Sequence, residues 1–176
     1  WAAGDAELRE IALPYMEDVY QLAGGAVQIA VPDGLRCLVV ERISGSRSMA
    51  VLSKPGTRLP LHASGVGKVL LALGDQDVHE AVFSSLDKYT SQTITDAAAL
   101  QKQLKTIVSR GYAETSEELM PGATSVAVPV RGRGGAVIAA LGVVSPKSSA
   151  ALAGIVPVLQ VTASALSRKL ISTGWE

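Results

Sequence analysis

Hydrophobic and polar residues follow two different periods along this chain. Apolar residues spaced three and four positions apart predict helices over residues 6–23, 75–86, 96–111 and 148–171. Pro14 and Pro157 lie inside the first and the last of these segments. Because proline lacks a backbone N–H, we expect each of these two helices to break or restart there.

Short apolar runs bounded by turn residues predict strands. The run AVQIAVPDGLRCLVVERI surrounds Asp33-Gly34, a pair typical of a hairpin turn. Further extended segments are expected at 48–53, 112–115, 123–130 and 136–144. The order helix, strands, helices, strands, helix favours an α+β domain with an antiparallel sheet. The last two strands are apolar on both faces, so we expect both sides of the sheet to be covered.

The stretch LPLHASGVGKVLLAL, residues 59–73, resembles the end of a phosphate-binding loop. That loop needs an earlier glycine and a Ser or Thr after the lysine, and both are missing, which argues against nucleotide hydrolysis. Ser64 is instead a good N-cap for the apolar segment that follows. Gly65, Val66 and Gly67 then fall at the first helical positions, where a ligand carboxylate would be able to approach the unpaired N–H groups and the positive end of the helix. The alternative is a capped helix that simply packs close to a strand.

Composition narrows the function classes. The chain is 48% hydrophobic and 18% charged, which is typical of a globular domain, and 16 basic residues balance 16 acidic ones. This neutrality lacks the broad positive field of a free-standing nucleic-acid binder. The single cysteine, Cys37, excludes an internal disulfide and a cysteine-based zinc site, and we expect it to be buried. No apolar run of membrane-spanning length and no signal peptide is found, so we expect a cytoplasmic protein. Because the chain begins at Trp1, we expect a fragment or a processed form.

The residues that could act in catalysis are few. We expect His62 to be a hydrogen-bonded structural residue and His79 to be solvated, and two isolated histidines do not form a zinc site. Glu117 and Glu118 are adjacent, so they read as a charged turn rather than a general acid–base pair. Ser125 lies on an expected strand rather than on the sharp turn of a hydrolase nucleophile. We therefore expect no catalytic residue, no metal and no cofactor.

Three stretches in matching order make the sequence similar to one family. They are PGTRLPLHASGVGKVLLA (55–72), RGYAETSEELMPG (110–122) and VIAALGVVSP (137–146), and they resemble the effector-binding domain of IclR-type bacterial transcription regulators. The resemblance implies a GAF-like fold: a curved antiparallel sheet with helices on both sides and a ligand pocket against the sheet. It implies that residues 1–12 end a linker helix and that 13–176 form the effector-binding domain. It also implies an N-terminal winged helix-turn-helix domain that would bind DNA, and we expect this domain to be absent from this chain.

The resemblance also implies a binding site for small metabolites, often organic acids or aromatic compounds. Carried over position by position, the residues expected to contact the effector are Ser48, Val51, Leu59, Gly65, Val66, Thr115, Ala123, Ser125, Gly142 and Val144. Members that bind very small acids have polar groups at several of these positions, where this chain has Thr115, Gly142 and Val144. We therefore expect a roomier, more apolar pocket and a ligand larger than a two- or three-carbon acid, such as an aromatic acid.

Two other function classes stay open beside this one. The favoured interpretation is a ligand-sensing domain that forms homodimers or tetramers and controls DNA binding by the missing N-terminal domain. One alternative is a small GAF-like enzyme that uses Cys37 or His62. The other is a structural domain that only holds subunits together without a ligand.

Overall fold

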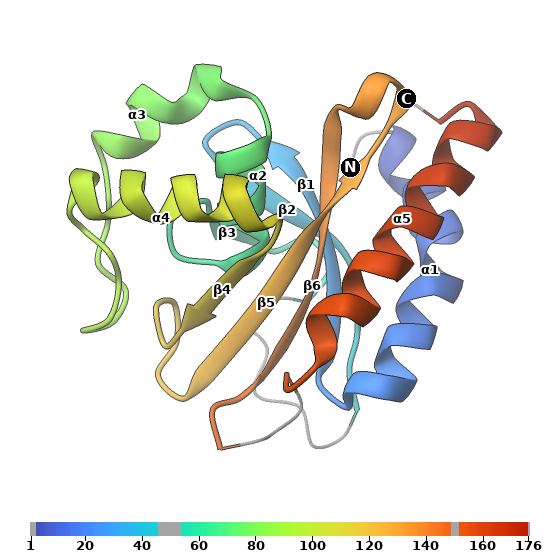
Figure 1. Ribbon diagram of the computed structural model, residues 1–176, viewed down its shortest axis with the longest axis horizontal. Helices are drawn as coiled ribbons and strands as arrows, with labels where there is room; N and C mark the ends of the chain where they lie inside the picture. Colours follow the sequence, from blue (N-terminus) through green and yellow to red (C-terminus); the bar gives the residue numbers. More distant parts are fainter. Residues whose placement is uncertain (1–2, 46–53, 149–151, 176) are drawn as a thin grey trace.

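The computed structural model describes residues 3–45, 54–148 and 152–175, and its centre is one curled antiparallel sheet (Figure 1). Within these residues the sheet has six strands in the order β3-β2-β1-β6-β5-β4. The strands are β1 (Ala26–Asp33), β2 (Arg36–Ile43), β3 (Arg58–Pro60), β4 (Ala113–Ser116), β5 (Ala123–Arg131) and β6 (Val137–Pro146). The α+β fold with an antiparallel sheet, predicted from the order of elements, is confirmed.

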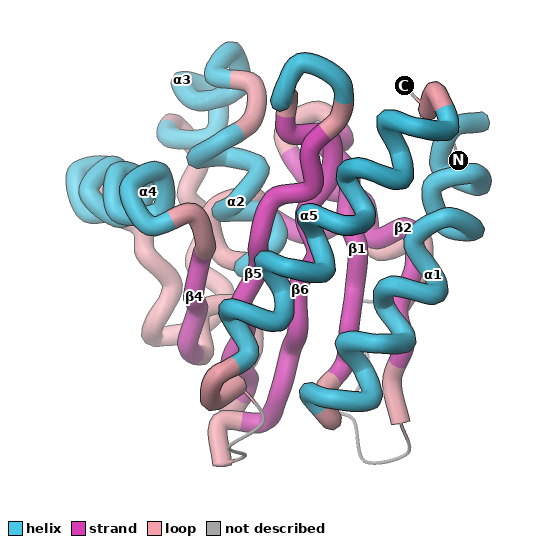
Figure 2. The backbone as a smooth tube through the Cα atoms, turned by 45° about the vertical axis from the view of Figure 1, so that its right-hand side comes forward, coloured by secondary structure: helices cyan, strands magenta, loops and turns pink. Residues whose placement is uncertain are grey.

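Helices cover the sheet on both sides, as the two views in Figures 1 and 2 show. One side carries α1 (Ala3–Ala23) and α5 (Ile155–Thr173), which lie next to each other. The other side carries α2 (Gly65–Leu73), α3 (His79–Phe83) and α4 (Ala97–Arg110). Short 3₁₀ turns occupy Gln76–Val78 and Arg133–Gly135. The expectation of a two-sided sheet is confirmed.

The expected breaks at the two prolines are wrong. Helix α1 continues through Pro14, because Leu8, Met16 and Val19 on its inner face are fully buried and this packing outweighs one lost hydrogen bond. Helix α5 begins only at Ile155, so Pro157 falls in its first turn. Backbone N–H groups there have no partner within the helix, and proline is therefore tolerated.

Other predicted elements hold with small shifts. The first hairpin turns at Gly34 and Leu35, one residue later than expected, because Asp33 still pairs with Arg36 and Gly34 takes the positive φ of +61°. The helix expected over 75–86 is shorter and consists of the 3₁₀ turn and α3. The extended segment expected at 48–53 lies outside the described residues.

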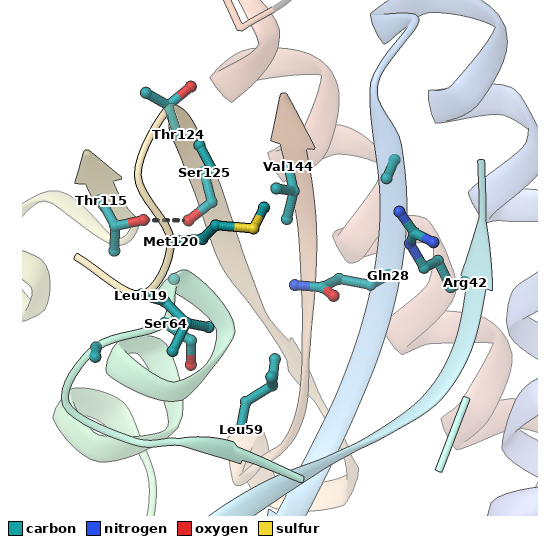
Figure 3. Close-up of a pocket in the computed structure, with 14 residues that line it drawn as sticks. Gln28, Arg42, Leu59, Ser64, Thr115, Leu119, Met120, Thr124, Ser125 and Val144 are labelled. Atoms are coloured by element: carbon teal, nitrogen blue, oxygen red, sulfur yellow. Dashed lines mark hydrogen bonds between the residues drawn. The ribbon is translucent and has the colours of Figure 1, made fainter. Parts of the chain in front are cut away.

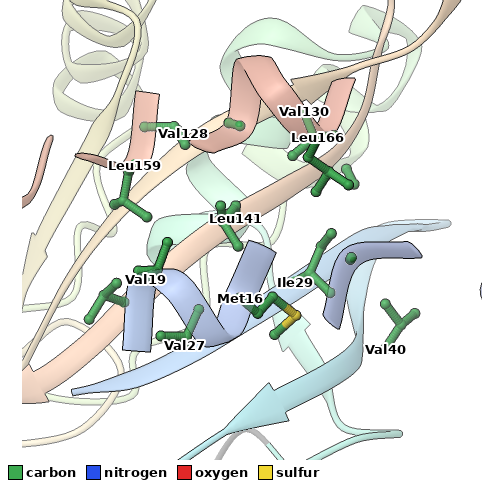
Figure 4. Packing of buried hydrophobic residues seen from close by; sticks show 14 of the residues in the cluster. Met16, Val19, Val27, Ile29, Val40, Val128, Val130, Leu141, Leu159 and Leu166 are labelled. Atoms are coloured by element: carbon green, nitrogen blue, oxygen red, sulfur yellow. The ribbon is translucent and has the colours of Figure 1, made fainter. Parts of the chain in front are cut away.

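The strands place large and small residues on opposite faces. Toward α1 and α5 they present Val27, Ile29, Val128 and Leu141, which pack with helical side chains such as Leu159 (Figure 4). Toward α2 and α4 they present mainly alanines, namely Ala30, Ala113, Ala127 and Ala140. We call these the α5 side and the α2 side. The small residues of the α2 side leave room for α2 to approach the sheet.

Candidate functional site

The start of α2 is a capped helix N-terminus. Ser64 has the extended conformation of an N-cap, and its hydroxyl accepts a hydrogen bond from Gly67 N–H at 3.1 Å. The same hydroxyl donates to the carbonyl of Pro60 at 2.7 Å. Among the residues that the structure describes, no acceptor is bonded to the N–H groups of Gly65 and Val66. The predicted cap is confirmed, and two N–H donors remain at the positive end of the helix.

The two glycines of this turn let the helix approach its neighbours closely. A methyl group at Gly65 would lie 2.5 Å from Ser125 Oγ, and one at Gly67 would lie 2.6 Å from the carbonyl oxygen of Pro60. The start of α2 therefore combines both features that the sequence left as alternatives, close packing against a strand and N–H groups without an acceptor among the described residues. Gly67 serves packing against the preceding loop, while Gly65 sets the helix start directly against Ser125 on β5.

A pocket opens between this helix start and the sheet (Figure 3). One row of cross-strand neighbours runs across its sheet wall, from Thr115 on β4 through Ser125 and Val144 to Ala26 on β1. The remaining lining residues are Gln28, Arg42, Leu59, Ala63, Ser64, Gly65, Leu119, Met120, Ala123 and Thr124. Most of this wall is apolar, and a few polar groups are fixed at its ends, as is usual for small-molecule sites.

Those polar groups lie at two places in the pocket. Near α2, the hydroxyls of Thr115 and Ser125 are hydrogen-bonded to each other at 2.5 Å. On β1, Gln28 is 3% exposed, and its Oε1 has no hydrogen-bond partner among the described residues. Arg42 is the cross-strand neighbour of Gln28, and partial burial lowers the pKa of its guanidinium. The pocket thus offers donors near α2 and both a donor and an acceptor near β1.

The loop that carries Leu119 and Met120 over the pocket is held by a buried ion pair. Lys68, in the first turn of α2, is completely buried and binds the carboxylate of Glu118. Burial lowers the pKa of Lys68 and raises the pKa of Glu118, and the charge of each partner opposes the shift of the other. Thr93 Oγ1 also donates to the carbonyl of Glu118 at 2.6 Å. The ion pair therefore ties the pocket loop to the helix whose N-terminus faces the pocket.

The expectation that Glu117 and Glu118 form a charged surface turn is wrong for Glu118. Only Glu117 lies at the surface, where it pairs with Lys147 at 2.9 Å. Its hydrogen bond from Lys147 lowers the pKa of Glu117. The sequence did contain a signal for the buried pair: Lys68 is the only charged residue in GVGKVLLAL.

The residues expected to contact an effector fall into three groups. Six of them line the pocket: Leu59, Gly65, Thr115, Ala123, Ser125 and Val144. Ser48 and Val51 lie outside the described residues. Val66 was expected to contribute its backbone N–H; its side chain is fully buried, and a methyl group at Gly142 would lie 3.0 Å from Val66 Cγ1. Gly142 does not line the pocket either, and Val66 of α2 lies against the space where a side chain at Gly142 would be.

Eight residues that line the pocket were not among those expected to contact an effector, namely Ala26, Gln28, Arg42, Ala63, Ser64, Leu119, Met120 and Thr124. Gln28 was visible as a lone amide in the apolar run AVQIAV, on the same strand face as Ala26 and Ala30. A buried amide in such a run needs a partner, and this requirement is the signal that points to a site. Leu119 and Met120 carry no comparable signal, because a fixed loop conformation brings them to the pocket.

The candidate nucleophile and bases are structural. Cys37 is fully buried, and burial raises the pKa of its thiol to about 12. His62 is hydrogen-bonded to the carbonyl of Asp87 at 2.8 Å, as expected. His79 was expected to be solvated, which is wrong, because its Nε2 lies 2.5 Å from the carbonyl of Leu71.

Two further searches cover only the described residues. No group of three or more His, Cys, Asp or Glu side chains is placed there to hold a metal ion. No helix among them has the length and apolar character needed to cross a membrane.

A curled antiparallel sheet, helices on both sides and a pocket at a helix N-terminus define a GAF-like α+β domain. The family model for the C-terminal region of IclR bacterial transcriptional regulators matches residues 2–168, and the chain belongs to this family. The family is regulatory rather than catalytic, and the relatives are named as transcriptional regulators. The chain is therefore a regulatory domain and not an enzyme.

Individual relatives support this assignment. The HTH-type transcriptional regulator XynR of Escherichia coli K12 is 32% identical over 97% of this chain and 69% of its own length. For other curated relatives, the chain spans about half of their length. An IclR homolog from Microbacterium hydrocarbonoxydans, solved with 4-hydroxybenzoate, is similar in structure with a TM-score of 0.89 and 35% sequence identity. The match covers 96% of this chain and 70% of the homolog's chain. The inducer-binding domain of PobR from Acinetobacter, a double mutant solved with 3-hydroxybenzoic acid, has a TM-score of 0.81 at 27% identity and covers 90% of this chain and 96% of its own.

Proposed function

We propose that this domain binds an aromatic carboxylic acid in the pocket at the start of α2, and that binding controls DNA recognition by an N-terminal winged helix-turn-helix domain. The observation that carries this proposal is the start of α2, where among the described residues no acceptor is bonded to the N–H groups of Gly65 and Val66. Gly65 lines the pocket, whose sheet wall is mostly apolar. A carboxylate placed there accepts two hydrogen bonds and meets the positive end of the helix dipole.

The lining of the pocket supports an acid with a large apolar part. Leu59, Leu119, Met120 and Val144 offer aliphatic and thioether surfaces to the faces of a ring. The similar structures from Microbacterium hydrocarbonoxydans and Acinetobacter hold hydroxybenzoates, which belong to the same chemical class. A two-carbon acid would leave most of this surface without contacts.

The mode of regulation completes the proposal. Homodimers or tetramers of the domain would rearrange when the effector binds, and the attached DNA-binding domains would report the change in the cytoplasm. The Lys68–Glu118 ion pair supports this coupling, because a carboxylate that pulls on the start of α2 also acts on the loop of Glu118. Sedimentation of the chain with and without benzoate tests whether effector binding changes its oligomeric state.

Binding is tested by thermal melting and titration calorimetry against benzoate, benzamide and glyoxylate. Benzoate at about 100 times its dissociation constant should add about 2.7 kcal/mol to the free energy of unfolding and raise Tm by roughly 5–10 °C. Benzamide has the same ring without the charge and should bind more weakly. Benzoate and benzamide of equal affinity would exclude a carboxylate at the helix start.

The variant Val66→Pro removes one of the two N–H donors and should reduce the preference for benzoate over benzamide. Because the preference is a ratio measured within one variant, a general loss of stability does not imitate it. A tight complex with glyoxylate would contradict the proposal of a large aromatic ligand.

A further inference from the structure

We propose that Gln28 recognises a hydroxyl group of the effector, so that the effector is an aromatic acid with its hydroxyl opposite its carboxylate. This inference rests on the proposed function, because it takes the carboxylate to lie at the start of α2. It adds a second recognition point at the other end of the pocket and gives it to a residue outside the set implied by the family resemblance.

The side-chain amide of Gln28 is buried with one hydrogen bond missing among the described residues. The side chain is 3% exposed, and its Oε1 has no partner among the described residues. Leaving a buried acceptor unpaired costs about 1–3 kcal/mol. Turning the amide by 180° would exchange its nitrogen and oxygen but would leave one acceptor to satisfy. Since Gln28 lines the pocket, a ligand is able to supply the missing donor.

The neighbours of Gln28 narrow the chemistry of that donor. On one side β6 places Gly142 beside it, which has no side chain, and on the other side β2 places Arg42. A guanidinium only donates hydrogen bonds, whereas the free oxygen of the amide only accepts them. A hydroxyl group of the ligand is able to donate a hydrogen bond to Oε1 of Gln28, and its oxygen is able to accept one from another donor. A second carboxylate on the ligand would place its oxygen atoms, which only accept hydrogen bonds, against the amide oxygen of Gln28, which also only accepts them.

The position of Gln28 sets the length of the ligand. Gly65 lies against Ser125 on β5, whereas Gln28 lies on β1, and β6 runs between them. Two strand spacings amount to roughly 10 Å. Figure 3 shows the side chain of Gln28 pointing from β1 back toward β6 and α2, which shortens this span. A six-membered ring with substituents at opposite positions bridges the remaining distance, and a short aliphatic acid does not.

Titration calorimetry with three acids tests the role of Gln28. The acids are benzoate, 4-hydroxybenzoate and 4-methoxybenzoate, whose ether oxygen accepts a hydrogen bond but cannot donate one. We expect the parent chain to prefer 4-hydroxybenzoate over benzoate by at least about tenfold and to show no such preference for 4-methoxybenzoate. In Gln28→Met the ratio of the affinities for 4-hydroxybenzoate and benzoate should fall to about one.

A control variant and a second measurement distinguish a loss of hydroxyl recognition from a general change in stability. Gln21 is exposed on α1, so Gln21→Met should keep the full preference. Without ligand, Gln28→Met should melt at a higher temperature than the parent, because it removes an unpaired buried amide.

The outcomes separate the two proposals. If benzoate binds but the parent shows no preference for the hydroxyl, or if Gln28→Met keeps that preference, Gln28 does not recognise a hydroxyl and only this inference fails. If neither benzoate nor 4-hydroxybenzoate binds, the proposed function fails and this inference with it.

Discussion

The two sides of the sheet are built from the same strands for different purposes. On the α5 side, Val27, Val126 and Leu141 pack against α1 and α5 in a core of aliphatic residues. One position further along each strand, the α2 side has Gln28, Ala127 and Gly142. Because successive side chains point to opposite faces, each strand contributes large residues to one side and small or polar residues to the other.

The difference separates stability from recognition. The α5 side buries large side chains, which is the main source of folding free energy. The α2 side gives up part of that burial, and it gains a pocket, a close approach of α2 to the sheet and a buried ion pair. Changes on the α5 side should therefore alter stability without altering binding, whereas changes on the α2 side should alter both.

The largest expected effect is the loss of a large side chain from the α5 side. Leu141 is fully buried between the sheet and the two helices. Leu141→Ala should lower the free energy of unfolding by about 3–4 kcal/mol, because it removes apolar contacts and leaves a cavity. Urea unfolding measures this loss. Affinity of the folded variant for benzoate should stay within about twofold, and a larger change would show that the two sides are not independent.

A slightly smaller loss is expected when the ion pair of the α2 side is broken. Lys68→Met leaves the carboxylate of Glu118 without its partner and should cost about 3 kcal/mol. This is the lower end of the range for buried pairs, because Glu118 also borders an open cavity. Unlike Leu141→Ala, this variant should also weaken benzoate binding, since it frees the loop of Leu119 and Met120.

The matched control for Lys68→Met is the double variant Lys68→Met with Glu118→Leu. Replacing both charges by apolar groups removes the unpaired carboxylate, so most of the lost stability should return. Urea unfolding of all four combinations gives the coupling free energy of the pair. A double variant no more stable than Lys68→Met would mean that Glu118 is not desolvated.

A smaller effect is expected from adding one methyl group to the α2 side. In Gly142→Ala the new Cβ would lie 3.0 Å from Val66 Cγ1 and 3.2 Å from the carbonyl oxygen of Val126. Relieving this contact requires α2 to move outward, and we expect a loss of about 1–2 kcal/mol in urea unfolding. If Gly142 instead made room for a ligand, stability would be unchanged and only binding of benzoate would fall.

These residues also show where sequence-based prediction succeeds and where it ends. Ser64 and the helix after it were predictable, because an N-cap and an apolar run are local signals. The buried state of Glu118 was not, because it depends on Lys68, fifty positions away in sequence. Gly142 was assigned to the pocket by position along a strand, but its actual neighbour, Val66, depends on how α2 lies across the sheet. Contacts between segments far apart in the sequence leave no local pattern, and they are the features of the site that could not be predicted.

The last and smallest effect is a pH dependence with opposite signs in two variants. In Glu118→Gln, Lys68 keeps its burial but loses its carboxylate, so the pKa of Lys68 should fall further below its ordinary value of 10.5. A depressed pKa contributes stability that is present above the unfolded value and is lost as pH falls through the folded value. The stability gap between Glu118→Gln and the parent should therefore narrow as pH rises.

In Lys68→Met the sign reverses, because the buried group left behind is an acid. The pKa of Glu118, already raised above 4.5 by burial, should rise further without the lysine. A raised pKa contributes stability that is present below the unfolded value and is lost as pH rises through the folded value, so the gap to the parent should narrow as pH falls. Urea unfolding of both variants from about pH 5 to about pH 9 measures the two slopes. Equal slopes for the two variants would show that water reaches the α2 side more than the burial of Lys68 implies. Slopes of opposite sign would identify the desolvated ion pair as the feature that distinguishes this side from the aliphatic core across the sheet.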